Sequence, residues 1–184
     1  ATPSLKAAEA VNIEENIKAL GFDRYYRELR SYKSNQVKIA IFDYGYGKFQ
    51  DEKGYTIPEN TVLKQRPGDN TALDQNNTHG LAMAQIITQY MTNNYNRWSN
   101  APQLYLYKTD GYTNFEWVIK DAIQNGVDVI LHSIVIEYGS NYDGRGFYNS
   151  LVNQATNAGI VWVNAAGNFG LTTYNTKVNV EDNY

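Results

Sequence analysis

The sequence predicts an α/β fold with three layers, in which a mostly parallel sheet carries helices on both faces. Short apolar runs alternate along the chain with helical segments of about a dozen residues, which is the pattern of right-handed β-α-β units. Two helix stop signals, at residues 125–126 and 157–159, each lead directly into an apolar run. The 184 residues include 42% hydrophobic and 19% charged ones, which suits one globular domain with a sizeable core.

The elements follow from local patterns. A first strand is predicted over residues 37–42, a short apolar run that ends at Asp43 and a glycine-containing turn. Further strands are predicted over residues 61–64, 104–107, 127–131 and 160–163. Helices are predicted over residues 78–90, 114–124 and 146–158, with the remainder of 48–77 as loop. The first 35 residues have apolar side chains at helical spacing up to Gly21, and a second short helix is expected over residues 25–29.

Composition excludes several classes of function. A net charge of -3 gives no basic surface for nucleic acid, so we expect no nucleic-acid partner. No apolar run approaches the roughly 20 residues that span a bilayer, and no signal-peptide pattern opens the chain, so no membrane partner is expected either. The chain contains no cysteine, which excludes disulfides, zinc-thiolate sites and a cysteine nucleophile.

Three polar residues lie where open α/β sheets place their sites, near the carboxyl ends of strands. Asp43 follows the first strand, His79 begins a helix, and Asn168 follows the last strand beside a glycine. A buried carboxylate bonded to one imidazole nitrogen leaves the other nitrogen free to take a proton, and a side-chain amide can donate to an oxyanion. Taken singly, each residue is also typical of ordinary turns and helix starts.

The combination resembles the subtilisin-like serine proteases, the subtilases of peptidase family S8, over the N-terminal part of their catalytic domain. Five segments match the family in its own order, and they cover roughly residues 37–170. Asp43 and His79 are 36 residues apart, and His79 and Asn168 are 89 apart, as the family pattern requires. The matching segments are residues 37–45, 79–84, 101–108, 126–134 and 159–168.

The resemblance implies a serine endopeptidase with an Asp-His-Ser triad and an asparagine oxyanion hole. Asp43 would orient His79, His79 would act as general base, and the Asn168 amide would stabilise the oxyanion. A polypeptide substrate would pair with one segment and face a pocket wall built by another. The pairing segment would be Ser133, Ile134 and Val135, and the wall would be Ala165, Ala166 and Gly167.

The nucleophile is the main departure from the family pattern. In subtilases the serine opens a buried helix in a Gly-Thr-Ser-Met-Ala type of motif, several dozen residues beyond the asparagine, and no serine of this chain has those neighbours. The expectation is therefore a subtilisin-like domain that is incomplete at its C-terminus and inactive alone. Its partner would be the missing C-terminal part of the domain, in cis or as a second chain.

Other departures keep a second function open. Tyr44, Leu81, Gln85 and Val135 replace smaller or hydroxyl-bearing residues of the family pattern. Tyr44, Leu81 and Val135 favour the alternative of a catalytically inactive subtilase-like binding module. A third alternative ignores the resemblance and sees a flavodoxin- or receiver-like domain with Asp43 as an acidic site. That alternative lacks partner acids beside Asp43 and a glycine-rich phosphate loop.

The remaining expectations concern organisation and environment. Residues 1–184 are expected to form a single domain, with 1–36 as a helical segment packed on it. No cofactor is expected, although structural calcium in the loop 92–100 stays open, and we expect a secreted, periplasmic or cell-surface location. The carboxylates of the long loop are expected to be solvated surface groups because hard cations need several convergent oxygens. These carboxylates are Asp51, Glu52, Asp69 and Asp74.

Overall fold

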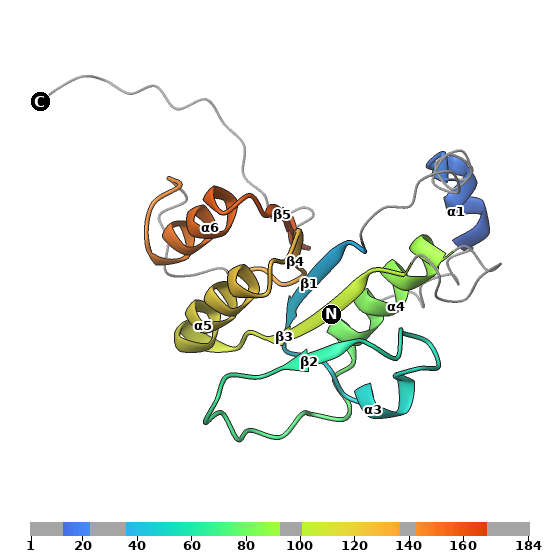
Figure 1. Cartoon of the computed structure of the whole chain (residues 1–184), viewed down its shortest axis with the longest axis horizontal. Coiled ribbons are helices and arrows are strands. Elements are labelled where there is room, and N and C mark those ends of the chain that lie inside the picture. The colour runs from blue at the N-terminus through green and yellow to red at the C-terminus, as the bar shows by residue number, and fades with distance from the viewer. Residues whose placement is uncertain (1–12, 23–35, 93–100, 137–142, 169–184) are drawn as a thin grey trace, which may run out of the picture.

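The computed structural model describes residues 13–22, 36–92, 101–136 and 143–168 (Figure 1). The helices are α1 (Ile13–Ala19), α3 (Phe49–Glu52), α4 (His79–Thr92), α5 (Gly111–Gln124) and α6 (Phe147–Asn157). The strands are β1 (Lys38–Asp43), β2 (Val62–Lys64), β3 (Gln103–Lys108), β4 (Val129–His132) and β5 (Val161–Asn164). The short helix expected over 25–29 lies outside the described residues, as do residues 93–100 of the loop considered for calcium.

The five strands form one parallel sheet in the order β2-β3-β1-β4-β5. β1 is central and pairs with β3 on one side and β4 on the other, with Asp43 opposite Lys108 and Phe42 opposite His132. Each pair of parallel neighbours that is linked through a helix forms a β-α-β unit. The predicted α/β class with a parallel sheet is therefore confirmed.

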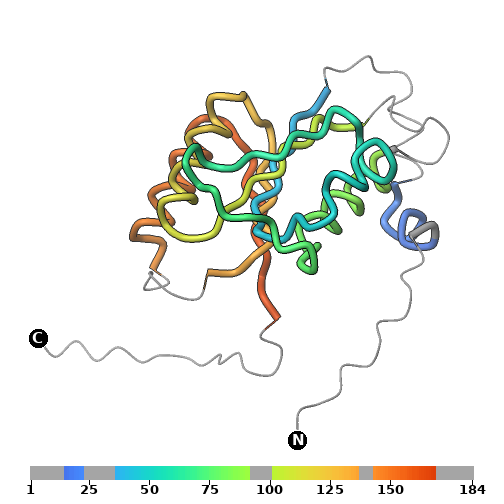
Figure 2. The backbone as a smooth tube through the Cα atoms, turned by 90° about the horizontal axis from the view of Figure 1, so that it is seen from below, coloured from blue at the N-terminus to red at the C-terminus, as the bar shows by residue number. Residues whose placement is uncertain are grey.

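The two faces of the sheet are covered by different helices, which gives the three layers (Figures 1 and 2). Successive side chains of a strand point to opposite faces, so β1 feeds two cores. Ala40 and Phe42 join the core under α5 and α6, whereas Ile39 and Ile41 join the core under α4. All four side chains are buried. The apolar run that predicted β1 is thus continuous because both of its faces are covered.

The predicted helix stops are also confirmed. Gly126 and Gly159 have φ angles of 62° and 88°, the left-handed region that glycine adopts without steric cost. The Gly126 amide donates to the Ile123 carbonyl at 3.0 Å, and the Gly159 amide donates to Thr156 at 3.0 Å. Each glycine therefore ends its helix and turns the chain into the next strand.

One short helix was missed, and the start of another helix was predicted too late in the chain. Residues 49–52 were expected to be loop but form α3, whose Phe49 is buried. A helix of a single turn is too short to show a helical period in the sequence. Helix α5 begins at Gly111, three residues earlier than predicted, because the polar first turn carries no periodic apolar signal.

The described part of β5 is an open edge with a half-covered face. Val161 and Val163 are 58% and 44% exposed, and they pair in register with Val129 and Leu131 of β4. Residues in register point to the same face, and Val129 packs against the core under α4. Among the described residues, no helix covers the face of β5 that lies on the α4 side of the sheet.

In the ranges that the structure describes, none of the helices combines the length and apolarity that a bilayer crossing requires.

Candidate active site

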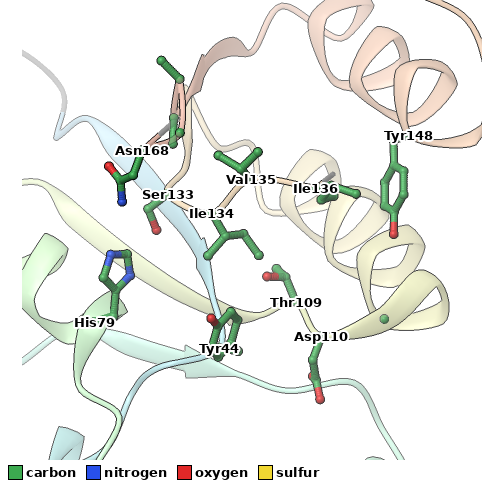
Figure 3. A pocket seen from close by; sticks show the side chains of 14 residues that line it. Tyr44, His79, Thr109, Asp110, Ser133, Ile134, Val135, Ile136, Tyr148 and Asn168 are labelled. Carbon is green, nitrogen blue, oxygen red and sulfur yellow. The ribbon is translucent and has the colours of Figure 1, made fainter. Parts of the chain in front are cut away.

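The candidate site is a cleft of about 740 Å³ at the carboxyl ends of the strands. His79 lies at one end of the labelled side chains and Tyr148 at the other, with residues 133–136 between them (Figure 3). Residues 165–168 line the cleft as well. The structure thus brings into one cleft His79, Ser133, Ile134, Val135, Ala165, Ala166, Gly167 and Asn168.

Asp43 and His79 form the centre of the site. Their Oδ2 and Nδ1 atoms are 2.7 Å apart, with Asp43 fully buried and the His79 side chain 53% exposed. The other carboxylate oxygen, Oδ1, accepts hydrogen bonds from the Tyr44 and Gly45 amides at 2.8 and 2.9 Å. With Oδ1 bound to the turn, Oδ2 is fixed toward the imidazole, and the far side of the ring is open to the cleft.

Two glycines permit this close approach of α4 to the end of β1. A Cβ on Gly80 would lie 2.6 Å from Asp43 Cβ and 2.6 Å from Tyr46 Cε1, which is closer than such atoms come. A Cβ on Gly45 would lie 2.9 Å from the His79 backbone nitrogen. The Leu81 amide also donates to the Gly45 carbonyl at 3.1 Å. The glycines after Asp43 and His79 are therefore steric requirements of the dyad.

Tyr46 is a site residue that the sequence did not reveal. It is fully buried under Asp43 and Gly80, and its hydroxyl donates to the Ile41 carbonyl at 2.7 Å and lies 3.2 Å from the Tyr107 carbonyl. Burial and the charge of Asp43 raise the pKa of Tyr46 well above its usual value, so it stays a donor. It links β1 to β3 directly beneath the dyad. A tyrosine after a turn gives no pattern that could predict this role.

Ser133 uses its hydroxyl on the acid. Its Oγ donates to Asp43 Oδ2 at 2.5 Å, and its amide donates to the Phe42 carbonyl at 3.3 Å. The segment that Ser133 opens continues along the cleft as residues 134–136. Among the serines in the described ranges, Ser133 and Ser150, neither donates to His79, and the Ser150 hydroxyl bonds within α6.

Asn168 lines the same cleft at the end of the turn that follows β5. Gly167 before it has a φ of 86°, which glycine adopts readily, and this turn brings residues 165–168 back over the sheet edge. In Figure 3 the amide of Asn168 faces the side of the cleft that holds Ser133 and His79. The arrangement places a donor amide and an imidazole on one space, with the buried acid bonded to the imidazole from behind.

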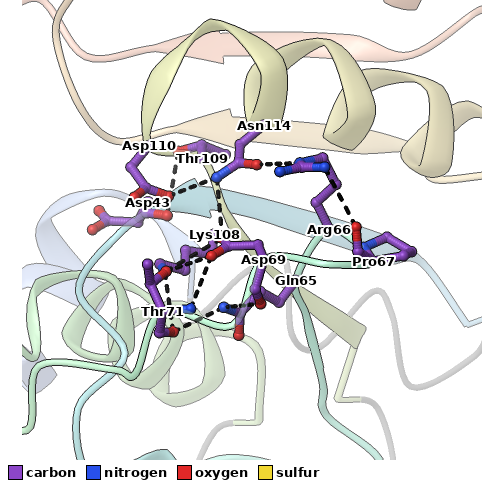
Figure 4. A network of polar contacts seen from close by, with 10 residues as sticks. All are labelled: Asp43, Gln65, Arg66, Pro67, Asp69, Thr71, Lys108, Thr109, Asp110 and Asn114. Atoms are coloured by element: carbon purple, nitrogen blue, oxygen red, sulfur yellow. Dashed lines mark hydrogen bonds and ion pairs between the residues drawn. The ribbon is translucent and has the colours of Figure 1, made fainter.

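A network of polar contacts lies next to the cleft, and its member Asp110 also lines the cleft (Figure 4). Lys108, the register partner of Asp43, pairs with Asp69 at 3.4 Å, and both side chains are less than a tenth exposed. The Asn114 amide donates to Asp69 at 3.2 Å and to Asp110 at 2.9 Å, while Arg66 Nε donates to Asn114 at 2.7 Å. The network ties the long loop to the start of α5.

The expectation that Asp69 is a solvated surface group was therefore wrong. Hydrogen bonds from the Thr71 hydroxyl and amide, together with the charge of Lys108, hold the pKa of Asp69 far below its usual value. The sequence shows an aspartate in a polar loop, and only the fold brings Lys108 and Asn114 to it.

In the described part of the chain, no group of three or more histidine, aspartate or glutamate side chains could hold a metal ion.

An acid at the end of a central parallel strand, hydrogen-bonded to a histidine at the start of the following helix, is the arrangement of a hydrolase with an imidazole base. The family model described as the subtilase family, Peptidase S8, matches residues 34–184. The chain therefore belongs to the subtilase family, as its motifs predicted, and this membership supports a serine-protease type of function. None of the curated proteins compared with the chain matches it.

Proposed function

We propose that the protein is a serine endopeptidase of subtilisin type that hydrolyses peptide bonds through an Asp-His-Ser triad. The observation that carries the proposal is the 2.7 Å hydrogen bond between buried Asp43 and half-exposed His79 at one end of the cleft. This geometry suits a base because the Nδ1 proton is held by the carboxylate while Nε2 is left to take a proton.

The chemistry assigns a role to each residue of the cleft. His79 Nε2 takes the proton of a serine hydroxyl as its oxygen attacks the scissile carbonyl carbon, and the Asn168 amide donates to the oxygen that becomes negative. His79 then gives the proton to the leaving amine. The substrate backbone lies as an added strand along residues 133–135, and residues 165–167 form the wall beside the residue before the scissile bond.

We further propose that the nucleophilic serine comes from protein beyond residue 184, in the same chain or in a second one. Two observations support this partner. Val161 and Val163 of β5 are exposed on the side of the sheet that α4 covers elsewhere, and exposed apolar surface of this kind marks a contact site. The outer edge of β5 has no partner among the described strands.

The test is hydrolysis of fluorescein-labelled casein by the protein produced from its complete gene. Asp43→Asn and His79→Gln are each expected to lower kcat by about 10⁴-fold, because the base loses its tautomer or is removed. Asp51→Asn makes the same chemical change at an exposed carboxylate of α3 and should leave the rate unchanged. Equal rates for Asp43→Asn and the wild type would exclude the triad.

A catalytically inactive binding module is the second candidate function. Tyr44 is 50% exposed and lines the cleft beside His79, where the family pattern has a small hydroxyl residue. Its bulk favours a site that holds a peptide without turning it over. In that case the complete gene product would bind labelled casein without cleaving it, and Asp43→Asn would bind equally well.

The location of the protein is part of the same proposal. An endopeptidase that acts on polypeptide substrates suits a secreted, periplasmic or cell-surface site. Fractionation of the producing cells, followed by detection with an antibody against the chain, tests this. Recovery of the protein only from the cytoplasm would contradict it.

A further inference from the structure

The second histidine of the chain lies directly beneath the cleft. His132 ends β4, is 3% exposed, and packs its ring against Phe115 and Trp162, with ring centres 5.4 and 5.6 Å away. The negative charge of Asp43, on the neighbouring strand β1, favours the protonated form of this imidazole. The proposed chemistry makes no use of this buried imidazole, although the next residue, Ser133, already belongs to the cleft.

Hydrogen bonds connect His132 to the start of the segment 165–168, which also lines the cleft. His132 Nδ1 is 2.7 Å from Asn164 Oδ1, and Asn164 Nδ2 donates to the Ala165 carbonyl at 2.7 Å. The Ala165 amide in turn donates to the His132 carbonyl at 3.0 Å. Trp162 Nε1 lies 3.4 Å from the same Asn164 oxygen, so two donors point to one end of this amide. The Asn164 side chain is thereby held in one orientation.

These hydrogen bonds form a closed circuit of His132, Asn164 and Ala165, and the circuit fixes the tautomer and the charge of His132. Because Asn164 Oδ1 accepts, Nδ1 carries the proton and Nε2 is left as an acceptor. Nε2 is buried and has no hydrogen-bond partner among the described residues. Protonation would add a charge and an N–H at Nε2 with no acceptor to receive it, which is costly away from water. Nδ1 carries its proton in both forms, so protonation would disturb the circuit only by driving the ring toward an acceptor for the new N–H at Nε2.

The circuit joins two segments that both line the cleft. Residues 133–136 continue directly from His132, and residues 165–168 continue directly from Asn164. We propose that neutral His132 is a positioning residue for the peptide-binding cleft, because it holds the Asn164 amide against the first carbonyl of the wall 165–167. The assignment of peptide as the ligand rests on the proposed function.

The proposal predicts an acid-sensitive wall that is independent of His79. Burial lowers the pKa of His132 below its ordinary value of about 6.5, and the Asn164 bond and the Asp43 charge only partly offset this. As the pH falls through this lowered value, His132 gains its proton, and the ring shifts to find an acceptor or water for the new N–H at Nε2, which draws Nδ1 away from Asn164. Residues 165–167 then lose their fixed position, and peptide binding weakens.

NMR spectroscopy of the full chain tests the positioning directly. The chain has two histidines, so His79→Gln leaves His132 as the single imidazole. Its nitrogen shifts should show the Nδ1–H tautomer at pH 8, and the amide signals of Ala165 and Gly167 should shift with the same midpoint as His132. Asn164→Ala should abolish that shared response. An Nε2–H tautomer, or amide signals that ignore the His132 midpoint, would overturn the proposal.

Binding of fluorescein-labelled casein peptides, followed by anisotropy, tests the consequence for the ligand. His132→Phe keeps a flat ring without a donor and should weaken binding about tenfold, the equivalent of one lost hydrogen bond. His132→Asn keeps a donor at the place of Nδ1, so it should bind like the wild type at pH 7.5 and show no weakening on acidification. Asn164→Ala, at an exposed side chain, should weaken binding as His132→Phe does.

The outcomes separate this inference from the proposed function. If the wild-type chain does not bind casein peptides, the proposed peptide site fails, while the NMR titration still decides the role of His132. If the wild type binds and both His132→Phe and Asn164→Ala bind equally well, the peptide site stands and the positioning role is excluded.

Discussion

At the scale of single residues, Gly80 sets the distance between α4 and the end of β1. Its Cα passes so close to Asp43 and Tyr46 that no side chain fits there. Helix propensity alone would favour alanine in α4 by about 1 kcal/mol. Overpacking a buried contact costs about 1–3 kcal/mol, and here both obstructing groups are fully buried. The steric effect should therefore exceed the gain in propensity.

We expect Gly80→Ala to lower the free energy of unfolding by about 1–2 kcal/mol and to separate His79 from Asp43. Urea unfolding measures the first effect, and the His79 imidazole shifts measure the second. Gln89→Ala, at an exposed position of the same helix, is the control and should hardly change the stability. A Gly80→Ala protein as stable as the wild type would show that α4 can move away freely.

The sequence identified the residues of the cleft that lie at ends of predicted elements. Asp43, His79 and Asn168 each follow or begin such an element, so their meeting in one cleft follows from the topology of a parallel sheet. Tyr46 was missed, because its contacts join strands that pair only in the folded sheet and no local pattern shows that a tyrosine will be buried there. His132 lies at the end of a predicted strand, but its burial and its bond to Asn164 follow only from the folded sheet.

At the scale of elements, the Lys108–Asp69 pair fastens the long loop to the end of β3. Both side chains are almost fully buried, so removing one charge leaves the other without its partner. Asp69→Asn should lower the free energy of unfolding at pH 7 by about 1–2 kcal/mol, because Lys108 keeps its hydrogen bonds to Thr71. Asp51→Asn, at an exposed carboxylate, should have no measurable effect. Chemical denaturation of the two variants gives the comparison.

The same pair predicts a dependence on pH. The pKa of Asp69 is lower in the folded protein than in the unfolded chain, so its contribution to stability is complete above the unfolded value of about 3.9. This contribution is lost progressively as the pH falls below that value, because the unfolded carboxyl takes up its proton first. Asp69→Asn should therefore show a shallower loss of stability between about pH 5 and pH 2. If the free energy of unfolding fell equally steeply with pH in the variant and in the wild type, this prediction would be contradicted.

The elements themselves were largely predictable from the sequence. Strands with two covered faces appear as unbroken apolar runs, and glycines at 126 and 159 mark the helix ends. α3 was missed because one turn leaves no period, and the start of α5 was placed late because its first turn is polar. The network around Asp69 was missed for a different reason. Its members come from the loop, β3 and α5, which are far apart in the sequence.

At the scale of the whole molecule, the exposed valines of β5 test whether the domain is completed by further protein. Val163→Glu places a charge on a side chain that is 44% exposed in this chain, so it should hardly change the stability of residues 1–184. In the complete gene product the same charge should lower the melting temperature clearly, because it would be buried against the added segment. Equal, small effects in both proteins would show that nothing covers β5.

The position of β1 in the middle of the sheet has a consequence for biosynthesis. This strand is made first, but the partners on its two sides, β3 and β4, are both made later. Lys108, the last residue of β3, is 65 positions after Asp43. At about 5–20 residues per second, the ribosome needs about 3–13 s to supply the first neighbour. For that time the nascent chain carries residues 39–42 as an apolar segment without its strand partners, the kind of surface that makes a folding intermediate prone to aggregation.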